Sequence, residues 1–199
     1  FTSVVSHDLR NPLHVADGSL ELAREECDGE HLERIDHAIS RMDALIEDLL
    51  ELARGEDGVE DTAPIDLVQV AQDCWENVDT EGASLVTHVD RTLSADESRL
   101  KQVIENLVRN AVEHGGDEVT ITIGGLDEGF YVEDDGQGIP GDKHDEVFTA
   151  GYSTADDGTG IGLSIVEQIV EAHNWDIRIV EGNDGGARFE ITGVEFVGT

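Results

Sequence analysis

The hydrophobic positions of the first part of the chain predict two long helices. Apolar side chains recur at intervals of three and four residues over residues 1–26 and again over residues 30–54, which is the period of a helix with one buried face. Pro12 falls inside the first helix and should bend it. The apolar positions are Val5, Leu9, Leu13, Ala16, Leu20 and Ala23 in the first helix, and Leu32, Ile35, Ile39, Met42, Leu45, Ile46, Leu49, Leu50 and Ala53 in the second.

The apolar stripe of the second helix is wider than one partner helix can cover. Two chains together would bury it, so we expect a helical hairpin that forms half of a dimeric four-helix bundle. A hairpin that docks on the second domain of its own chain is the alternative. We assign residues 1–55 to this hairpin, residues 56–63 to a polar linker, and residues 64–199 to a second domain.

Beyond the linker the pattern changes to that of a mixed α+β domain. Stretches with alternating apolar residues predict strands, and stretches with helical periodicity predict helices along one face of a mostly antiparallel sheet. The expected strands begin at Ile65 and then cover 84–90, 91–95, 119–123, 130–133, 177–180 and 187–191, with 84–95 as a hairpin, and the expected helices cover 67–78, 96–114 and 163–173.

The charge balance narrows the possible partners. The chain has 46 acidic and 12 basic residues among 199, a net charge of −34, and its only lysines are Lys101 and Lys143. Such a surface repels nucleic acid and anionic membranes, so neither is an expected partner. Acidic residues spread over every segment, in place of lysine, also predict a halophilic protein, because concentrated salt screens self-repulsion within a few ångströms.

Several further classes are disfavoured by simple features. No run of eighteen apolar residues is present, which excludes a membrane-spanning helix within the sequence. Two cysteines, Cys27 and Cys74, fall in different predicted domains and do not indicate a disulfide framework or a zinc site. We expect a cytoplasmic fragment of a longer protein whose upstream sensor domain is attached to a membrane or soluble.

The first candidate for chemistry is His7, which lies on the first predicted helix. Asp8 is beside it and Asn11 follows one turn later. A neutral imidazole is a nucleophile, and a neighbouring carboxylate can orient it and take its proton. Taken alone, however, a solvated helical histidine is the favoured interpretation of such a pair.

The second candidate is a pair of asparagines on the predicted helix 96–114. Asn106 and Asn110 are four residues apart and therefore share one face. The amide oxygen of Asn110 is a suitable hard ligand for Mg²⁺ that phosphates also hold. Two asparagines beside Arg109 on a solvated face are an equally good interpretation of this segment alone.

The third candidate follows the strand predicted at 130–133. Asp134, at the end of that strand, can accept a hydrogen bond from an exocyclic amine such as that of adenine, and Gly136 and Gly138 allow a base to approach the backbone. The spacing of Gly136, Gly138 and Gly141 also fits a dinucleotide-binding loop, but Pro140 and the polar residues after it do not open an apolar-faced helix. A plain turn is the remaining alternative.

The fourth candidate is the glycine-rich segment 158–164, which leads into the last predicted helix. Free backbone N–H groups and the positive end of a helix dipole form an anion site. The segment is not a Walker loop, because no Gly-Lys-Ser or Gly-Lys-Thr occurs in the chain.

Taken in order, these four segments resemble the catalytic core of a sensor histidine kinase. Residues 6–13 resemble the H box, 106–111 the N box, 132–140 the G1 box and 158–163 the G2 box, while 146–148 resemble the F box more weakly. The resemblance covers nearly the whole chain. It implies a dimerisation and phosphotransfer hairpin followed by a two-layer α/β sandwich of the GHKL (Bergerat) ATPase type, and the acidic composition is similar to that of haloarchaeal members.

The resemblance also implies roles for individual residues. His7 would be the phosphoacceptor, Asp8 would orient it and take its proton, and Asn11 would position water for dephosphorylation of a partner. Asn110 would ligate Mg²⁺ with support from Asn106. Asp134 would bind adenine, and the remaining ATP-binding positions would be Arg109, Gly136, Gly138, Gly158, Thr159, Gly160, Gly162 and Leu163.

Some positions depart from the family pattern. Glu113 and His114 stand where the family often has a lysine and an aromatic residue, so charge neutralisation would rest on Mg²⁺, the helix terminus and Arg109 or Lys143. His14 lies seven residues after His7 on a similar face, but it lacks a neighbouring carboxylate and is the weaker candidate.

The sequence therefore predicts a homodimeric enzyme that phosphorylates His7 with ATP and Mg²⁺ and passes the phosphoryl group to the receiver domain of a response regulator. Phosphatase activity toward the regulator is part of this expectation. A plain ATPase of the same fold, or a dimeric scaffold that binds a regulator without ATP, are the alternatives.

Overall fold

The computed structural model describes most of the second domain and a few positions of the first. The described residues are 16, 20, 32, 35, 39, 42, 46, 62–78, 80, 82–116, 118–152 and 159–197. The predictions made for His7, Asp8, Asn11, His14, Cys27, Gly158, the bend at Pro12 and most of the linker fall outside them.

The seven described positions before the linker are all helical. Leu20 and Ile39 are buried against each other, and Ala16, Leu32 and Ile46 pack around them. Ile35 and Met42 belong to the same predicted apolar stripe, but they remain 48% and 46% exposed. The stripe is thus only partly covered within one chain.

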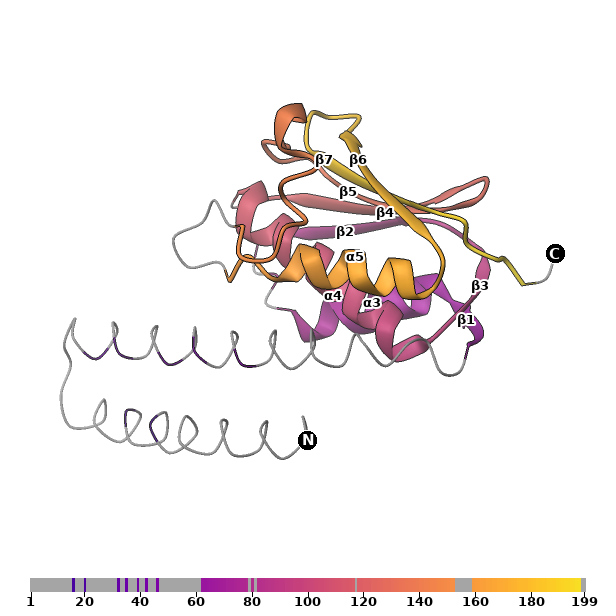
Figure 1. Cartoon of the computed structure of the whole chain (residues 1–199), viewed down its shortest axis with the longest axis horizontal. Coiled ribbons are helices and arrows are strands. Elements are labelled where there is room, and N and C mark those ends of the chain that lie inside the picture. The colour runs from indigo at the N-terminus through magenta and orange to yellow at the C-terminus, as the bar shows by residue number, and fades with distance from the viewer. Residues whose placement is uncertain are drawn as a thin grey trace.

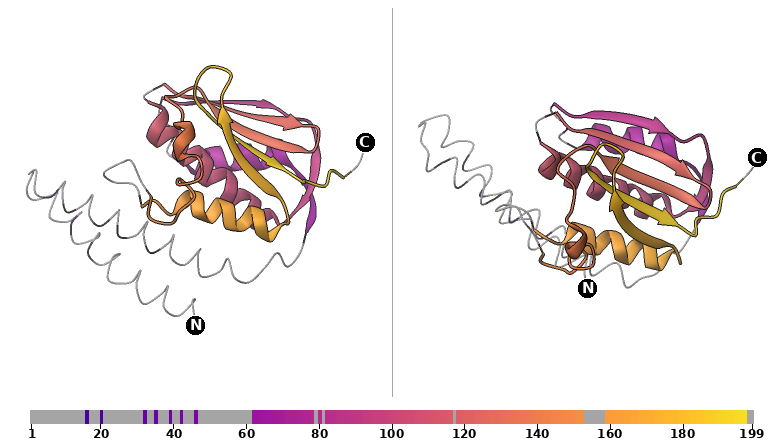
Figure 2. Two further views of the ribbon diagram at one scale, coloured as in Figure 1. Left: turned by 45° about the horizontal axis from the view of Figure 1, so that its top comes forward. Right: turned by 90° about the horizontal axis from the view of Figure 1, so that it is seen from above.

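The second domain has two layers, with its helices on one face of a sheet (Figures 1 and 2). Its elements are β1 (Ala63–Asp66), α3 (Leu67–Asn77), β2 (Ser84–His88), β3 (Thr92–Ala95), α4 (Glu97–Gly115), β4 (Thr120–Leu126), β5 (Gly129–Asp134), η1 (Gly141–Lys143), α5 (Gly162–Ala172), β6 (Asp176–Glu181) and β7 (Ala187–Thr192). The predicted α+β class, with helices lining one face, is confirmed.

The main sheet has five strands in the order β2-β4-β5-β7-β6. Only β2 and β4 are parallel, so the sheet is mostly antiparallel as predicted. The predicted hairpin over 84–95 is wrong: β2 pairs with β4, whereas β3 pairs with β1 in a separate two-stranded sheet. Alternation specifies which face of a strand is buried but not which strand it pairs with, and Leu93 and Ala95 achieve full burial on β3 without β2.

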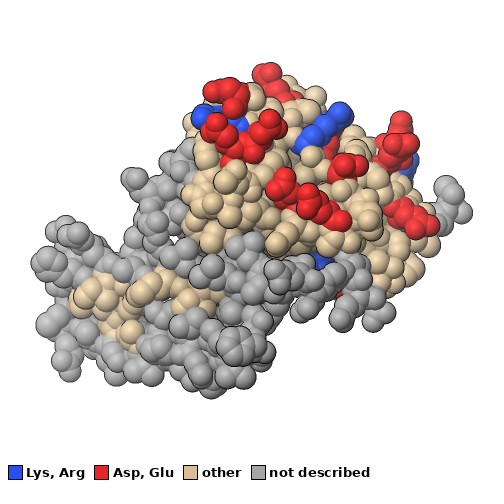
Figure 3. Space-filling view, in the orientation of Figure 1, with Lys and Arg blue, Asp and Glu red and all other residues tan. Residues whose placement is uncertain are grey.

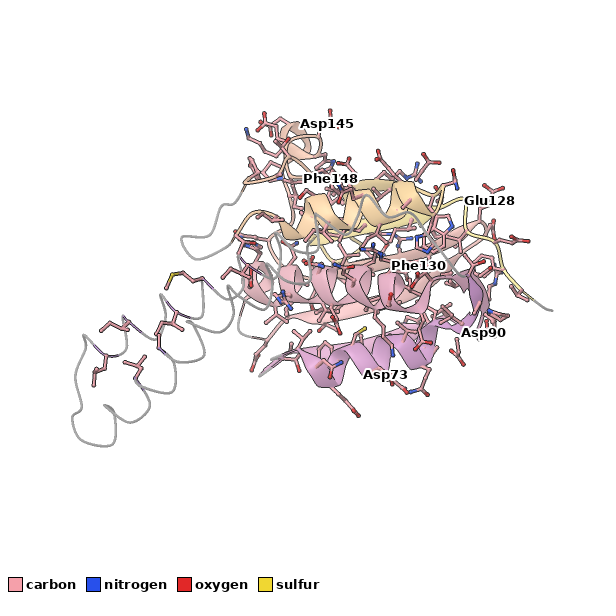
Figure 4. All side chains as sticks on the ribbon, turned by 60° about the horizontal axis from the view of Figure 1, so that its bottom comes forward. Asp73, Asp90, Glu128, Phe130, Asp145 and Phe148 are labelled. Carbon is pink, nitrogen blue, oxygen red and sulfur yellow. The ribbon has the colours of Figure 1, made fainter. Side chains whose placement is uncertain are left out.

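The core lies between the sheet and α4, whose predicted apolar face is buried throughout. Asp96 begins this helix by accepting hydrogen bonds from the backbone N–H groups of Ser98 and Arg99, at 3.0 and 3.2 Å. Phe130, which appears between α4 and α5 in the view of Figure 4, is fully buried and meets Trp175 edge-to-face, with ring centroids 6.4 Å apart. The labelled acidic residues Asp90, Glu128 and Asp145 lie at the periphery.

The structure bears on two features that the sequence analysis considered, the cysteines and the length of apolar helices. Cys74 is a buried free thiol, and burial raises its pKa to about 12, which makes it an unreactive core residue. None of the helices in the described part is both long and apolar enough to cross a membrane.

His173 connects the end of α5 to the beginning of α4. Its Nε2 lies 3.1 Å from the backbone N of Asp96, and its Nδ1 lies 2.8 Å from the carbonyl oxygen of Ile169. Because the Asp96 N–H donates, Nε2 must accept and the proton must be on Nδ1, which is the neutral form. Burial lowers the pKa of His173, and its ring stacks on Trp175 at 4.3 Å.

We expect this histidine to make folding sensitive to acid. Because the pKa of His173 is lowered in the folded protein, the unfolded chain binds more protons below about pH 6.5. The contribution of His173 to the free energy of unfolding is therefore fully present above that pH and decreases as the pH falls. A His173→Phe variant keeps the stacking on Trp175 but cannot be protonated. Urea unfolding from pH 7.5 to 5.5 should show a shallower loss of stability in the variant than in the parent, and equal slopes would contradict this role.

Candidate functional site

The site is organised around Asp134, the last residue of β5. Phe130, Val132 and Asp134 alternate along the strand, so Asp134 shares the buried face of the apolar residues and is only 8% exposed. Its Oδ1 accepts hydrogen bonds from the backbone N–H groups of Gly136 at 2.9 Å and Ala187 at 3.2 Å. Burial raises the pKa of Asp134 above its ordinary value, although these two hydrogen bonds act in the opposite direction.

Three segments approach Asp134 so closely that only glycine fits between them. A Cβ on Gly136 would lie 2.5 Å from the Cα of Gly115, at the end of α4. Gly138 has φ +69°, and a Cβ there would lie 2.8 Å from the carbonyl oxygen of Gly185. A Cβ on Gly186 would collide with the carbonyl oxygen of Asp134. The glycines therefore set the spacing between these backbone segments, whereas the predicted approach of a base to Gly136 and Gly138 stays a prediction.

The two asparagines of α4 differ in their surroundings. Asn106 is buried, and its Nδ2 donates to the carbonyl oxygen of Gln102 at 2.9 Å. Its Oδ1 faces Gly162, whose missing Cβ would lie only 2.8 Å away. Asn110, one turn further, is half-buried, and its amide has no hydrogen-bond partner among the described residues. Asn106 thus joins α4 to the start of α5, whereas Asn110 has an amide free to bind something else.

The second glycine segment prepares the beginning of α5. Gly160 has φ +69°, and its carbonyl oxygen accepts a hydrogen bond from the N–H of Gly151 at 2.8 Å. The Oγ1 of Thr159 lies 3.4 Å from the N of Ile161. No side chain among the described residues caps the first turn of α5, which begins at Gly162. Its N-terminal N–H groups are therefore the kind of donors that bind an anion.

The structure also distinguishes the basic residues considered for charge neutralisation. Lys143 forms an ion pair with Glu146, with Nζ and Oε2 2.6 Å apart. Arg109 is exposed beside Asn110 and has no ion pair with a described residue. Leu163 is half-buried and packs against the core. No group of three His, Cys, Asp or Glu side chains suited to a metal occurs in the described part of the chain.

Sequence reasoning found the two glycine segments but missed the turn between β6 and β7. Gly186 in that turn and Ala187, the first residue of β7, contact Asp134 as closely as the predicted residues do. The only available signal was the cluster Gly182, Gly185 and Gly186, which matches no motif. The rejection of a dinucleotide-binding loop agrees with the structure. Such a loop opens a long helix, but the element directly after Pro140 is the three-residue η1.

Comparison with known proteins agrees with this geometry. Residues 95–194, half of the chain, match the family described as histidine kinase-, DNA gyrase B- and HSP90-like ATPases, and the chain belongs to that family. Residues 1–58 match the His Kinase A phospho-acceptor domain. The combination of the two domains makes this chain a histidine kinase catalytic core.

The curated relatives are sensor kinases. The chain is 29% identical to the adaptive-response sensory kinase SasA of Nostoc sp. over 96% of its own length and 55% of the relative's. It is 27% identical to the sensor histidine kinase CpxA of Escherichia coli, over 95% of this chain and 45% of the relative. It is 34% identical to the sensor protein ChvG of Rhizobium meliloti, over 96% and 39%. The chain thus spans about half the length of these relatives.

Solved structures show the same architecture. Full-length ShkA in complex with AMPPNP is similar over 100% of this chain and 46% of that one, with a TM-score of 0.71 and 26% identity. The catalytic domain of histidine kinase ThkA is similar over 66% of this chain and 94% of that one, with a TM-score of 0.56 and 26% identity. The fold of residues 62–197 is therefore that of a histidine kinase ATP-binding domain.

The close approach of Gly186 to Asp134 can be tested with alanine substitutions. Gly186→Ala should lower the free energy of unfolding by about 1–3 kcal/mol, because its Cβ collides with backbone that cannot move freely. Gly141→Ala is the matched control, since a Cβ there meets nothing within 4 Å, and it should change stability by less than about 0.5 kcal/mol. Denaturant unfolding measures both, and equal effects would show that the contact carries no weight.

Proposed function

We propose that this chain binds ATP, transfers its γ-phosphoryl group to His7 and passes that group to an aspartate of a response regulator. The observation that carries the proposal is the presence of a phospho-acceptor domain over residues 1–58 on the same chain as an ATPase domain in which α4 contacts Gly136 beside Asp134 at one end and Gly162 through Asn106 further along. The names of the relatives, sensor kinases with 27–34% identity, support the same activity.

Asp134 is our candidate for adenine recognition. Its Oδ1 is occupied by two backbone N–H groups, whereas its Oδ2 accepts no hydrogen bond from a described residue. An ionised carboxylate fixed in this way can accept a hydrogen bond from the exocyclic amine of adenine. Gly136 and Gly138 would shape the adenine pocket, because they allow the end of α4 and the carbonyl oxygen of Gly185 to pack closely around the turn that follows Asp134.

Asn110, Arg109 and the start of α5 are our candidates for the polyphosphate. The unpartnered amide of Asn110 provides a hard oxygen that fits Mg²⁺, an ion that neutralises charge on the β- and γ-phosphates when it is bound. Arg109 is a better candidate than Lys143 for direct contact, since Glu146 already pairs with Lys143. The second glycine segment would form a backbone hinge at the start of α5 and supply the N–H donors that face the phosphates, and Asn106 would hold α4 against it. Its residues are Gly158, Thr159, Gly160, Gly162 and Leu163.

The chemical step would begin with a neutral His7 ring. A ring nitrogen forms a bond to the γ-phosphorus, the bond from that phosphorus to the bridging oxygen breaks, and ADP leaves. Asp8 would take the proton that the imidazole gives up. The phosphoryl group would then move from nitrogen to a carboxylate oxygen of the regulator, and Asn11 would position water for its later hydrolysis.

Homodimerisation is supported by the helical residues before the linker. Ile35 and Met42 are helical, apolar, about half exposed, and seven residues apart within the second predicted helix. That spacing places them on one face, as in helices that pack against a partner. A second copy of the hairpin would cover this face and complete a four-helix bundle, with the upstream sensor domain on the same polypeptide and the catalytic core in the cytoplasm.

A phosphorylation assay tests the proposal. Radioactive ATP labelled at the γ-phosphate should label the parent protein, and His7→Gln should abolish the label because the acceptor nitrogens are gone. Asn11→Ala is the matched control from the same segment: it should retain the label while slowing dephosphorylation of a regulator. Full labelling of His7→Gln would refute the acceptor, and bulk ATP hydrolysis without label would favour a plain ATPase.

We also propose that the chain is adapted to concentrated salt. Figure 3 shows Asp and Glu side chains over the visible face of the second domain, with few Lys or Arg among them. The net charge of −34 would destabilise the fold by repulsion at low ionic strength.

The midpoint of thermal unfolding should therefore rise markedly as KCl is increased from about 0.1 M, where the Debye length is about 10 Å, to above 1 M, where it is about 3 Å. Circular dichroism during heating measures it. A midpoint that does not change over this range would contradict the adaptation.

A further inference from the structure

The turn between β6 and β7, residues 182–186, packs directly against Asp134 and Gly138 of the proposed adenine site. The N–H of Gly182 donates to the carbonyl oxygen of Gly186 at 2.8 Å, which closes the turn. On one side, Gly186 touches the backbone of Asp134, and the carbonyl oxygens of Gly185 and Gly186 lie against Gly138. The next residue, Ala187, donates its N–H to Asp134 Oδ1. The position of this turn therefore sets the position of the Asp134 carboxylate.

Glu133 holds the turn from the opposite face of the sheet. Successive side chains of a strand point to opposite faces, so Glu133 points away from the helices while Asp134 points toward them. Its Oε1 accepts the backbone N–H of Asn183 at 2.6 Å, and its Oε2 accepts the Asn183 side-chain amide at 3.2 Å. Asn183 is the second residue of the turn, 50 residues away from Glu133 in sequence. One carboxylate thus binds the tip of the turn in two places.

Charge compensation keeps Glu133 in this buried position. It is 7% exposed and pairs with Arg188, its neighbour across the β5–β7 register, at 3.0 Å. Arg188 lies over the ring of Tyr131, 3.6 Å from its centroid, and also contacts Glu190 at 3.0 Å. Glu190 is a comparable carboxylate, 8% exposed and paired with Arg178 and Arg188, but none of its partners among the described residues is in the turn.

We propose that Glu133 and Asn183 are positioning residues of the nucleotide site: they hold the 182–186 turn against Gly138 and Asp134 and thereby fix the Asp134 carboxylate for the adenine amine. This inference rests on the proposed ATP-binding function. Both side chains act through the turn, since Glu133 is on the face of the sheet away from Asp134. Their effect should therefore be specific to recognition of the exocyclic amine.

The decisive measurement compares ATP with purine riboside triphosphate, which lacks the exocyclic amine. Calorimetric titration of the parent chain should show tighter binding of ATP by about tenfold, the effect of one good hydrogen bond. Glu133→Ala should lower ATP affinity by about the same factor and leave the purine analogue nearly unchanged, so the ratio approaches one. Glu190→Ala removes an equally buried carboxylate with the same Arg188 partner, and it should retain the parent ratio.

Asn183→Ala provides a second variant that keeps the fold intact if Glu133→Ala does not. It removes only the side-chain hydrogen bond, so the preference for ATP should fall by about two- to threefold. Asp184→Ala, an exposed neighbour in the same turn, is its control and should not alter the ratio.

The possible failures are distinguishable. A parent chain without a preference for ATP would refute adenine recognition by Asp134 and the positioning role with it. A parent that prefers ATP, with Glu133→Ala and Asn183→Ala retaining that preference, would overturn the positioning role alone. Equal weakening of both nucleotides would also overturn it, because a general loss of structure does not discriminate between them.

Discussion

The second domain depends on one buried carboxylate that is held by backbone from its own turn and from a distant part of the chain. Asp134 accepts N–H groups from Gly136, two residues later, and from Ala187, 53 residues later. Burial of a carboxylate is costly unless its oxygens are hydrogen-bonded. The described residues meet that requirement on Oδ1 alone, which leaves the second oxygen as the place where a ligand can make a selective contact.

The surrounding elements are arranged so that backbone, rather than side chains, approaches this carboxylate. Gly136 touches the end of α4, and Gly186 touches the backbone of Asp134. At the other end of the site, Asn106 on α4 lies directly against Gly162 at the start of α5. The helix that carries both asparagines is therefore in contact with each glycine segment, and a shift of α4 would affect both together.

The sequence predicted elements better than it predicted their neighbours. Helical periodicity located α4 and its buried face, because a 3.6-residue repeat is a local property. The partners of β2 and β3 could not be deduced, since pairing depends on contacts between residues far apart in the chain. The segments around Gly136 and Gly162 were found by their motifs, whereas the contact of Asn183 with Glu133 has no local signature at all.

The carboxylates of this acidic chain fall into two groups that respond differently to dissolved salt: exposed ones, and buried ones on the outer face of the sheet. Its exposed carboxylates respond to dissolved ions, because mobile counterions reach them and shorten the range of their repulsion. Glu133 and Glu190 are less than one-tenth exposed and have arginine partners supplied by the fold itself, so counterions have little access to them. Changes in the ionic medium should therefore act on the exterior of the domain, while the architecture behind Asp134 keeps the same internal charge balance.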